Sequence, residues 1–321
     1  MLIVSEEACQ AVVGRGDAFA AVESVFSAMA SGDAYNFPVI REAIGHADAL
    51  YGFKSGFDRA GLVLGLKSGG YWPGNMAKGL TNHQSTVFLF DPDTGQLHAL
   101  VGGNYLTAIR TAAASSVSIA HLARKDAKVL GMVGAGHQAG FQLRAAAEQR
   151  DFEKVVAWNF HPDMLPNLGA VAEEMGLPFE AVEREQLGAE ADVIISITSA
   201  HDPLMMKDWV KPGTHLACMG TDTKGKQEVD PALVAAATVF TDEIAQSTTI
   251  GEAQHAISKR LISEADITSI GDVINGTHPG RSSDAEITLF DGTGVGLQDL
   301  AVASVAARLA EEGGKAQQIQ L

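Results

Sequence analysis

A glycine-rich turn between a predicted strand and a predicted helix is the part of this sequence that most clearly indicates chemistry. Residues 128–142 read KVLGMVGAGHQAGFQ, in which a short apolar run leads into the pattern GxGxxA. Gly134 permits a tight turn, Gly136 lets the backbone approach a pyrophosphate, and the small Ala139 lets helix and strand pack closely. The N–H groups at the start of the helix would face the phosphates. The motif predicts a site for a nicotinamide or flavin dinucleotide, and the alternative is a structural strand-to-helix turn.

The residue that reads the adenosine ribose in such a site is usually an Asp or Glu at the end of the second strand. Here the predicted second strand, residues 154–158, is followed by Asn159, Phe160 and His161. An amide can hydrogen-bond a ribose hydroxyl without repelling a 2′-phosphate, but no arginine follows that could pair with such a phosphate. This pattern favours NAD as the cofactor and does not exclude NADP.

Three cations in the N-terminal third of the chain are candidates for holding a substrate carboxylate. Lys67 stands at the end of an apolar run, where a lysine is unusual unless its ammonium meets an anion. Arg110 is the one long polar side chain in a run of small residues, and Arg41 follows the segment FPVI. Taken singly, each is better explained by a surface or ion-pair role. Together they could clamp a carboxylate through charge-assisted hydrogen bonds.

A candidate acid or base follows another predicted strand. Residues 214–220 read THLACMG, and Asp222 comes two residues later. Parallel sheets bind ligands at the carboxyl ends of their strands, so Asp222 could be a general acid or base or could hold a substrate amine. The structural alternative is a cap on the next turn. His83 is better explained by a structural role, and no residue spacing predicts a metal site or a serine or cysteine nucleophile.

The elements that must position these residues change character along the chain. Apolar alternation in the first hundred residues predicts a helix at 20–30 and then hairpin strands at 49–56, 62–72, 85–90 and 96–101. Residues 106–122 form a predicted helix of small residues that leads into the glycine-rich turn. After Lys128, strands and helices alternate, which indicates a parallel sheet of Rossmann type. The further strands expected there are 154–158, 191–198, 214–220, 238–242 and 285–291, with helices at 165–175 and 300–311 and a frayed end at 313–321.

Composition limits the classes of function. The chain has 321 residues, of which 46% are hydrophobic, and this is enough for packed domains. Its net charge of −16 argues against nucleic acids and anionic membranes as partners. Cys9 and Cys218 fit no disulfide or metal spacing and are expected to be buried thiols. The N-terminus has no signal-peptide pattern and no run is long enough to span a membrane, so we expect a cytoplasmic protein.

Over nearly its whole length the chain resembles the ornithine cyclodeaminase/μ-crystallin family. The matching segments are LGLKSG around Lys67, GNYLTAIRTAAASS around Arg110, VGAGHQA, GTDTKGKQEVD around Asp222, and ITLFDGTGVGLQD. The resemblance implies an α/β fold in which residues 113–296 form a Rossmann-type parallel sheet domain that binds NAD. An α+β substrate-binding and dimerisation domain would consist of residues 1–112, completed by 297–321, and would make the protein a homodimer.

The resemblance also implies roles for single residues. The catalytic residues would be Asp222, which would act on or hold the substrate nitrogen, and Lys67. Substrate binding would involve Arg41, Lys67, Arg110 and, beside the reacting centre, Thr293. The cofactor would be bound by Asn82, Arg110, Thr111, Gly134, Gly136, His137, Gln138, Asn159, Thr198, Met219, Gly220 and Lys226.

Family members transfer a hydride between a nicotinamide and a carbon that bears nitrogen. The segment GTDTKGKQE differs from the cyclodeaminase pattern GGDCPGKTE and is similar to that of alanine dehydrogenases and imine reductases. We therefore expect an NAD(P)-dependent oxidoreductase acting on CH-NH2 or imine groups of a small carboxylated substrate, with iminosuccinate reduced to L-aspartate as the preferred reaction. The alternatives are ornithine cyclodeamination, alanine dehydrogenation and, less favoured, a non-catalytic ligand-binding role like that of μ-crystallin.

Overall fold

The computed structural model describes residues 1–320, and the chain forms two compact units. Unit 1 contains Met1–Arg110 together with the chain from Val295 onward, and unit 2 contains Thr111–Gly294. The first boundary falls inside one long helix, α3 (Asn104–Leu122). Each unit has its own eight-stranded sheet, and the two sheets differ in kind.

Unit 1 is built around a mainly antiparallel sheet with the order β16-β1-β7-β6-β5-β4-β2, and β3 pairs with β4. Its strands are β1 (Leu2–Val4), β2 (Ala34–Asn36), β3 (Ile40–Ala43), β4 (Leu50–Asp58), β5 (Val63–Tyr71), β6 (His83–Phe90), β7 (Leu97–Gly102) and β16 (Gln317–Gln318). Its other helices are α1 (Glu6–Val12), α2 (Arg15–Ala30), the short η1 (Met76–Lys78) and α11 (Gly296–Glu312).

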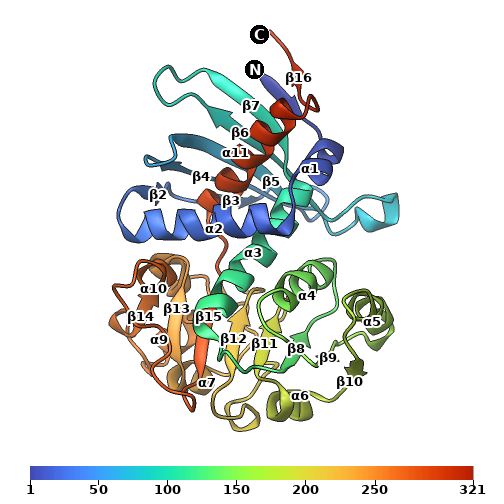
Figure 1. The fold of residues 1–321 in the computed structure, drawn as a ribbon, viewed down its shortest axis with the longest axis vertical. Helices are drawn as coiled ribbons and strands as arrows, with labels where there is room; N and C mark the ends of the chain where they lie inside the picture. The colour runs from blue at the N-terminus through green and yellow to red at the C-terminus, as the bar shows by residue number, and fades with distance from the viewer. Residues whose placement is uncertain (321) are drawn as a thin grey trace. The chain divides into compact units, whose positions relative to one another are not determined.

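Helix α11 packs closely on one face of this sheet (Figure 1). Glycine in the strands beneath it makes the approach possible: a Cβ atom at Gly65 would lie only 3.0 Å from the Leu300 side chain and 2.4 Å from the Phe88 carbonyl oxygen. Because side chains alternate between the two faces of a strand, Lys67 lies on the same face as Gly65, toward the N-terminal end of α11. The packing of this helix therefore determines what surrounds Lys67.

Unit 2 is a fully parallel sheet with the order β10-β9-β8-β11-β12-β15-β13-β14. Its strands are β8 (Val129–Val133), β9 (Lys154–Trp158), β10 (Phe179–Ala181), β11 (Val193–Ser196), β12 (His215–Cys218), β13 (Thr238–Thr241), β14 (Ile267–Ser269) and β15 (Thr288–Asp291). Its helices are α4 (Ala139–Ala147), α5 (Leu165–Glu174), α6 (Arg184–Glu190), α7 (Pro231–Ala236), α8 (Ile244–Ser247), α9 (Gln254–Ser258) and α10 (Ile270–Ile274), with short turns η2 (Pro162–Met164), η3 (Lys207–Trp209) and η4 (Glu264–Asp266).

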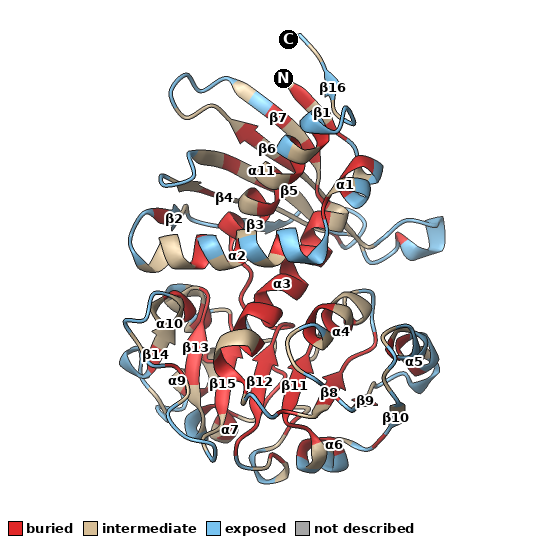
Figure 2. Ribbon diagram, viewed as in Figure 1, coloured by how far each residue is buried: buried red, intermediate tan, exposed pale blue. Residues whose placement is uncertain are grey.

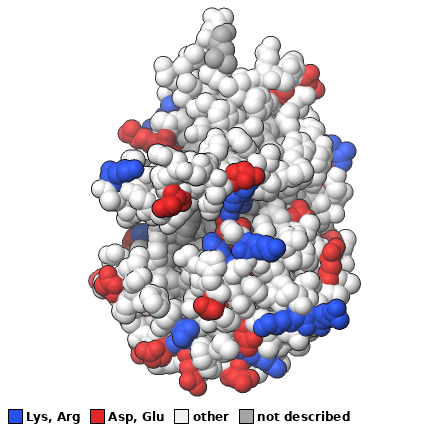
Figure 3. Space-filling model, turned by 180° about the vertical axis from the view of Figure 1, so that it is seen from behind, with Lys and Arg blue, Asp and Glu red and all other residues white. Residues whose placement is uncertain are grey.

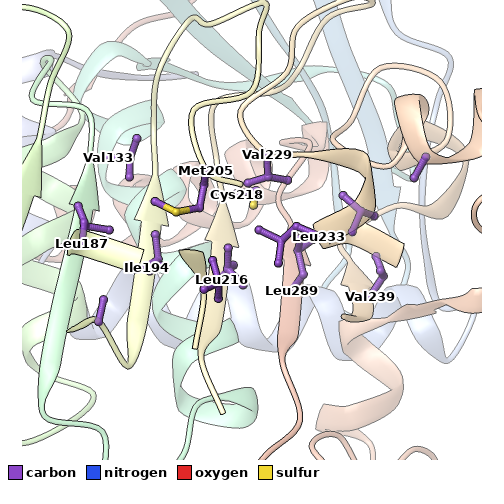
Figure 4. Close-up of a cluster of buried hydrophobic side chains, with 14 of the residues drawn as sticks. Val133, Leu187, Ile194, Met205, Leu216, Cys218, Val229, Leu233, Val239 and Leu289 are labelled. Carbon is purple, nitrogen blue, oxygen red and sulfur yellow. The ribbon is translucent and has the colours of Figure 1, made fainter. Parts of the chain in front are cut away.

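The central strands of unit 2 are buried along nearly their whole length, as expected for a parallel sheet covered on both faces (Figure 2). Val133, Ile194, Leu216 and Leu289 contribute to one hydrophobic cluster that crosses four neighbouring strands (Figure 4). Cys218 belongs to the same cluster, and both Cys218 and Cys9 are buried free thiols. The core thus fixes the strand ends, from which the polar loops emerge.

The fold class predicted from the sequence is confirmed: the chain contains a Rossmann-type parallel sheet unit and an α+β unit that uses both ends of the chain. Two details were wrong. Lys67 lies in the middle of β5 rather than at its end, because pairing with β4 and β6 continues to Tyr71. The segment 313–321 is not simply frayed, since β16 pairs antiparallel with β1, although residue 321 lies outside the described part of the chain.

The surface is acidic overall, in keeping with the net charge of −16. On the face drawn in Figure 3, acidic and basic side chains are interspersed rather than sorted into large areas of one sign. A search of the helices between residues 1 and 320 found none with the length and apolarity needed to cross a bilayer.

Candidate active site

The glycine-rich turn has the geometry of a dinucleotide site. Gly134 has φ +111, and a Cβ atom there would lie 2.6 Å from the Ile197 carbonyl oxygen, so only glycine fits at the end of β8. Gly136 is exposed, and a Cβ atom there would meet nothing within 4 Å. The backbone before α4 is therefore open to a ligand and free of side-chain obstruction, which fits a pyrophosphate.

Asn159 holds this turn in place. Its side-chain oxygen accepts a hydrogen bond from the Ala135 N–H at 3.1 Å, and its amide donates to the His161 carbonyl at 2.8 Å. From the sequence, Asn159 was expected to contact the ribose. In the structure its amide links the end of β9 to the glycine-rich turn and so helps to fix the shape of that turn, and the ribose contact stays a prediction. His137 is exposed beside the same turn, and Gln138 precedes α4.

A buried carboxylate that the sequence analysis did not single out organises the next two strand ends. Glu228 accepts hydrogen bonds from Ser196 Oγ at 2.8 Å and from the Gly220 N–H at 2.9 Å. It also accepts from the N–H and the hydroxyl of Thr198, at 2.6 and 2.8 Å. One side chain therefore joins the ends of β11 and β12, where Thr198, Met219 and Gly220 were predicted to line the cofactor. The residue lies within the segment GTDTKGKQEVD, which was its only sequence signal.

Asp222 lies in the loop after β12 and forms an ion pair with Lys226 at 2.8 Å. Lys226 also donates to the Gly220 carbonyl at 3.1 Å. Both charged groups are partly exposed, so Asp222 remains accessible to a substrate and can exchange protons with water. A carboxylate placed in this way can accept a hydrogen bond or a proton from an amine.

Thr293 follows β15 and is fixed by a second buried carboxylate. Asp242 accepts hydrogen bonds from the Thr293 N–H at 3.0 Å, from the Thr293 hydroxyl at 2.6 Å and from the Gly294 N–H at 2.8 Å. A third carboxylate, Asp291, accepts from Ser247 Oγ at 2.6 Å and from the Ala253 N–H at 3.2 Å. Burial raises the pKa of Asp291 to about 7, with a contribution from the charge of Asp242. Two buried carboxyl groups thus fix the loops at this sheet edge.

The cation cluster of unit 1 centres on a carboxylate that the sequence did not predict. Asp299, in the first turn of α11, forms ion pairs with Lys67 at 2.8 Å and with Arg110 at 2.9 Å. Arg110 also donates to Gln298 at 2.9 Å, and Lys67 donates to Thr107 at 3.4 Å. The two cations are each only 6% exposed and Asp299 is fully buried. The ring of partners holds both cationic side chains rigidly.

Electrostatics in this cluster are strongly coupled. Burial lowers the pKa of Lys67 to about 7, and the charges of Arg110 and Lys54 lower it too, whereas Asp299 raises it. Burial alone would raise the pKa of Asp299, but Arg110 and Lys67 bring it down to about 2. Asp299 is therefore ionised at any working pH and helps to keep Lys67 charged, so that the cluster can bind an anion.

The remaining predicted residues are dispersed. Arg41 is exposed on β3, where it stands opposite Gly52 of β4 and so shares a sheet face with Lys54 and Lys67. Asn82 donates to the Tyr71 hydroxyl at 3.2 Å and accepts from the Met76 N–H at 3.1 Å, and so organises the loop before β6. Thr111 and Met219 are buried. Between residues 1 and 320, no cluster of three or more His, Cys, Asp or Glu side chains has a metal-binding arrangement.

The fold and these sites define a two-unit protein with a Rossmann-type sheet and a buried pair of cations that share one carboxylate. The chain belongs to the ornithine cyclodeaminase/mu-crystallin family, whose model matches residues 7–313. This confirms the resemblance seen in the sequence motifs.

Individual relatives share nearly the whole chain. It is 63% identical to the iminosuccinate reductase of Paracoccus denitrificans over 321 residues, which is 100% of both chains. It is 34% identical to the alanine dehydrogenase of Archaeoglobus fulgidus over 307 residues, 95% of this chain and 93% of that one. The crystal structure of the Paracoccus reductase in complex with NAD+ matches with a TM-score of 0.97 over 100% of this chain and 99% of that chain. An archaeal alanine dehydrogenase dimer with bound NAD matches with a TM-score of 0.95 at 32% identity, over 100% and 99%.

Substitution of Asp299 by Asn should destabilise the protein strongly. Removal of the carboxylate charge leaves two buried cations without their counter-ion, at a cost of about 3 kcal/mol. The matched control is Glu312→Gln, which breaks an exposed ion pair with Arg308 on the same helix and should cost less than about 1 kcal/mol. Urea unfolding at one protein concentration measures both. Equal effects of the two substitutions would contradict the central role of Asp299.

Asp291 should make stability depend on pH. Its pKa is raised from 3.8 to about 7 by folding, so folding takes up a proton between these values and stability falls as pH rises through this window. Asp291→Asn mimics the neutral carboxyl group and should remove the fall in stability that Asp291 causes. That fall is about 1.4 kcal/mol for each unit by which folding raises the pKa. Melting temperatures of wild type, Asp291→Asn and the exposed control Asp202→Asn between pH 4 and 8 measure it. Parallel curves for all three proteins would show that Asp291 does not take up this proton.

Proposed function

We propose that this protein reduces iminosuccinate to L-aspartate with NADH. The observation that carries the proposal is the full-length 63% identity to an iminosuccinate reductase, together with the buried Lys67 and Arg110 pair that suits a carboxylate. The net reaction is iminosuccinate, NADH and a proton giving L-aspartate and NAD+. Unit 2 is proposed to be the NAD-binding domain, and unit 1 the substrate-binding and dimerisation domain.

NAD is the proposed cofactor, and the geometry of unit 2 supports it. The turn at Gly134 and Gly136 would hold the pyrophosphate, with His137 and Gln138 beside it and Asn159 fixing its shape. The loops after β11 and β12, tied together by Glu228, would line the rest of the cofactor. When bound, the reduced nicotinamide supplies the hydride that adds to the imine carbon.

The chain's own residues would bind the substrate and supply the proton. Lys67 and Arg110 are preorganised by Asp299 and would bind a substrate carboxylate without further side-chain ordering, and Arg41 is proposed to assist from β3. Asp222 would hold the imine nitrogen and manage the proton that becomes part of the amine, with Lys226 fixing the carboxylate. Thr293, held by Asp242, would position the reacting centre.

Two other activities of this family predict different behaviour. An alanine dehydrogenase would use the imine of pyruvate, which has one carboxylate. An ornithine cyclodeaminase would release ammonia from ornithine and consume no net cofactor. A non-catalytic ligand-binding protein would show neither, although retention of Asp222, Lys67 and Arg110 together favours catalysis over binding alone.

Oxaloacetate with excess ammonia should drive rapid NADH oxidation by this protein, since ammonia and the keto acid form iminosuccinate. The loss of NADH absorbance measures the rate, with an ammonia-free reaction as the blank and pyruvate plus ammonia in parallel. Asp222→Asn should lower kcat at least about a hundredfold while NADH binding, followed by its fluorescence, is kept. A signal with pyruvate alone would indicate alanine dehydrogenase. Ammonia release from ornithine, with no signal from either keto acid, would indicate a cyclodeaminase.

We also propose that the protein is a homodimer formed through unit 1. Several large apolar side chains of this unit are exposed, including Ile40 at 54% and Met76 at 70%. Ile40 stands directly opposite Phe53 on β4, so these two form part of one apolar surface. Exposed apolar surfaces of this kind mark protein interfaces, and one relative's structure is described as a dimer. The occupant of this surface is therefore proposed to be a second copy of the chain.

Introduction of charge into this surface should separate the copies. Ile40→Glu and Met76→Glu should each shift the molar mass measured by light scattering toward that of a monomer, because burial of an unpaired carboxylate is costly. Leu261→Glu is the matched control, since Leu261 is an exposed apolar residue of unit 2 and should leave the mass unchanged. A wild-type protein that is monomeric at micromolar concentration would contradict the proposal.

A further inference from the structure

A lysine outside the sequence motifs stands directly beside the carboxylate-binding cluster. In the antiparallel pairing of β4 and β5, Lys54 is the register partner of Lys67. Side chains that are directly opposite in such a pair project from the same sheet face with Cβ atoms about 5 Å apart. The face is the one covered by α11, because a Cβ atom at Gly296 would lie 3.2 Å from the Lys54 Cβ. Lys54 and Lys67 therefore flank the start of the same helix.

Like charges placed opposite each other on two strands destabilise a sheet unless an anion relieves them. The cluster already has Asp299, which forms ion pairs with both Lys67 and Arg110. The field of Lys54 reaches the whole cluster: besides burial, it helps to lower the pKa of Lys67, and it also acts on Asp299 and on His83. His83 is not a further cation, because burial and Lys67 lower its pKa to about 3. The charges of Lys54, Lys67 and Arg110 thus all act on Asp299.

We propose that Lys54 binds the second carboxylate of the substrate and so makes the enzyme specific for imines of four-carbon dicarboxylic acids. This inference rests on the proposed reductase function and names the residue that selects its dicarboxylate substrate. Lys67 and Arg110 take the carboxylate next to the imine carbon. Only one methylene group separates the imine carbon from the second carboxylate, and the ammonium of Lys54, on its flexible stem opposite Lys67, lies within reach of it.

A matched pair of non-reacting acids isolates the second carboxylate. Succinate and butyrate both have four carbons, and they differ in that one end of butyrate is a methyl group. With Lys54→Met, the inhibition constant of succinate should rise about tenfold or more, as expected for loss of a charge-assisted hydrogen bond. The inhibition constant of butyrate should stay within about twofold, and the KM for oxaloacetate with ammonia should rise more than kcat falls. Lys315→Met, an exposed lysine of the same unit, is the control and should change neither constant.

The proposal is overturned if Lys54→Met weakens succinate and butyrate equally, because Lys54 would then act on the shared carboxylate or on the fold. An unchanged constant for succinate overturns it as well. Should Lys54→Met fail to fold, Lys54→Gln keeps a polar side chain of similar length and should give the same selective loss, and Lys54→Arg should keep succinate binding. A wild-type protein without ammonia-dependent NADH oxidation would instead refute the proposed function, so the two failures are distinguishable.

Discussion

Unit 1 of this protein depends on one buried carboxylate between two buried cations. Lys67 and Arg110 come from a strand and from a helix, and neither could be buried beside the other without a counter-ion. Asp299 supplies this charge from a helix 189 positions further along the chain than Arg110. The ion pairs form only when α11 is packed on the sheet, which the glycines beneath it permit. Folding of unit 1 and formation of this ion-pair cluster are therefore the same event.

Unit 2 uses carboxylates for a different purpose. Glu228 and Asp242 accept hydrogen bonds from backbone N–H and hydroxyl groups at the ends of parallel strands. Each one accepts hydrogen bonds from several donors at the strand ends that would otherwise have no partner in the low-dielectric interior. The result is a rigid set of loops at the edge where a doubly wound sheet binds its ligand. The accessible Asp222 is thereby separated in role from the buried carboxylates around it.

The charged groups of the two units therefore lie in different surroundings. The cations of unit 1 lie in a fixed, desolvated arrangement that favours an anionic group of defined position. Asp222 of unit 2 is partly exposed and paired with a lysine, which suits a group that must exchange a proton during each turnover. The register between β4 and β5 places Lys54 opposite Lys67, so strand pairing decides which charged side chains meet in this cluster.

The sequence by itself determined the parts that depend on local patterns. Strand periodicity and the turn at Gly134 and Gly136 indicated the parallel sheet and its ligand edge, since both rest on residues that are neighbours in the chain. Local context also indicated Lys67, Arg110 and Asp222 as candidates, and the family motifs implied their roles. In the structure, Lys67 and Arg110 meet at Asp299, whereas Arg41 is exposed and Asn82 organises a loop.

Only the tertiary structure decided which groups face one another. Asp299 and Glu228 were present in recognised motifs, but a carboxylate's partners are set by packing between elements far apart in sequence. The same holds for Lys54. It lies on the same sheet face as Lys67 because of the register between β4 and β5, and a shift of one residue would place its side chain on the opposite face. Likewise, β16 pairs with β1 although they lie at opposite ends of the chain, and polar end segments carry no local pattern that predicts such pairing. Contacts of this kind are decided by the collapse of the core rather than by neighbouring residues.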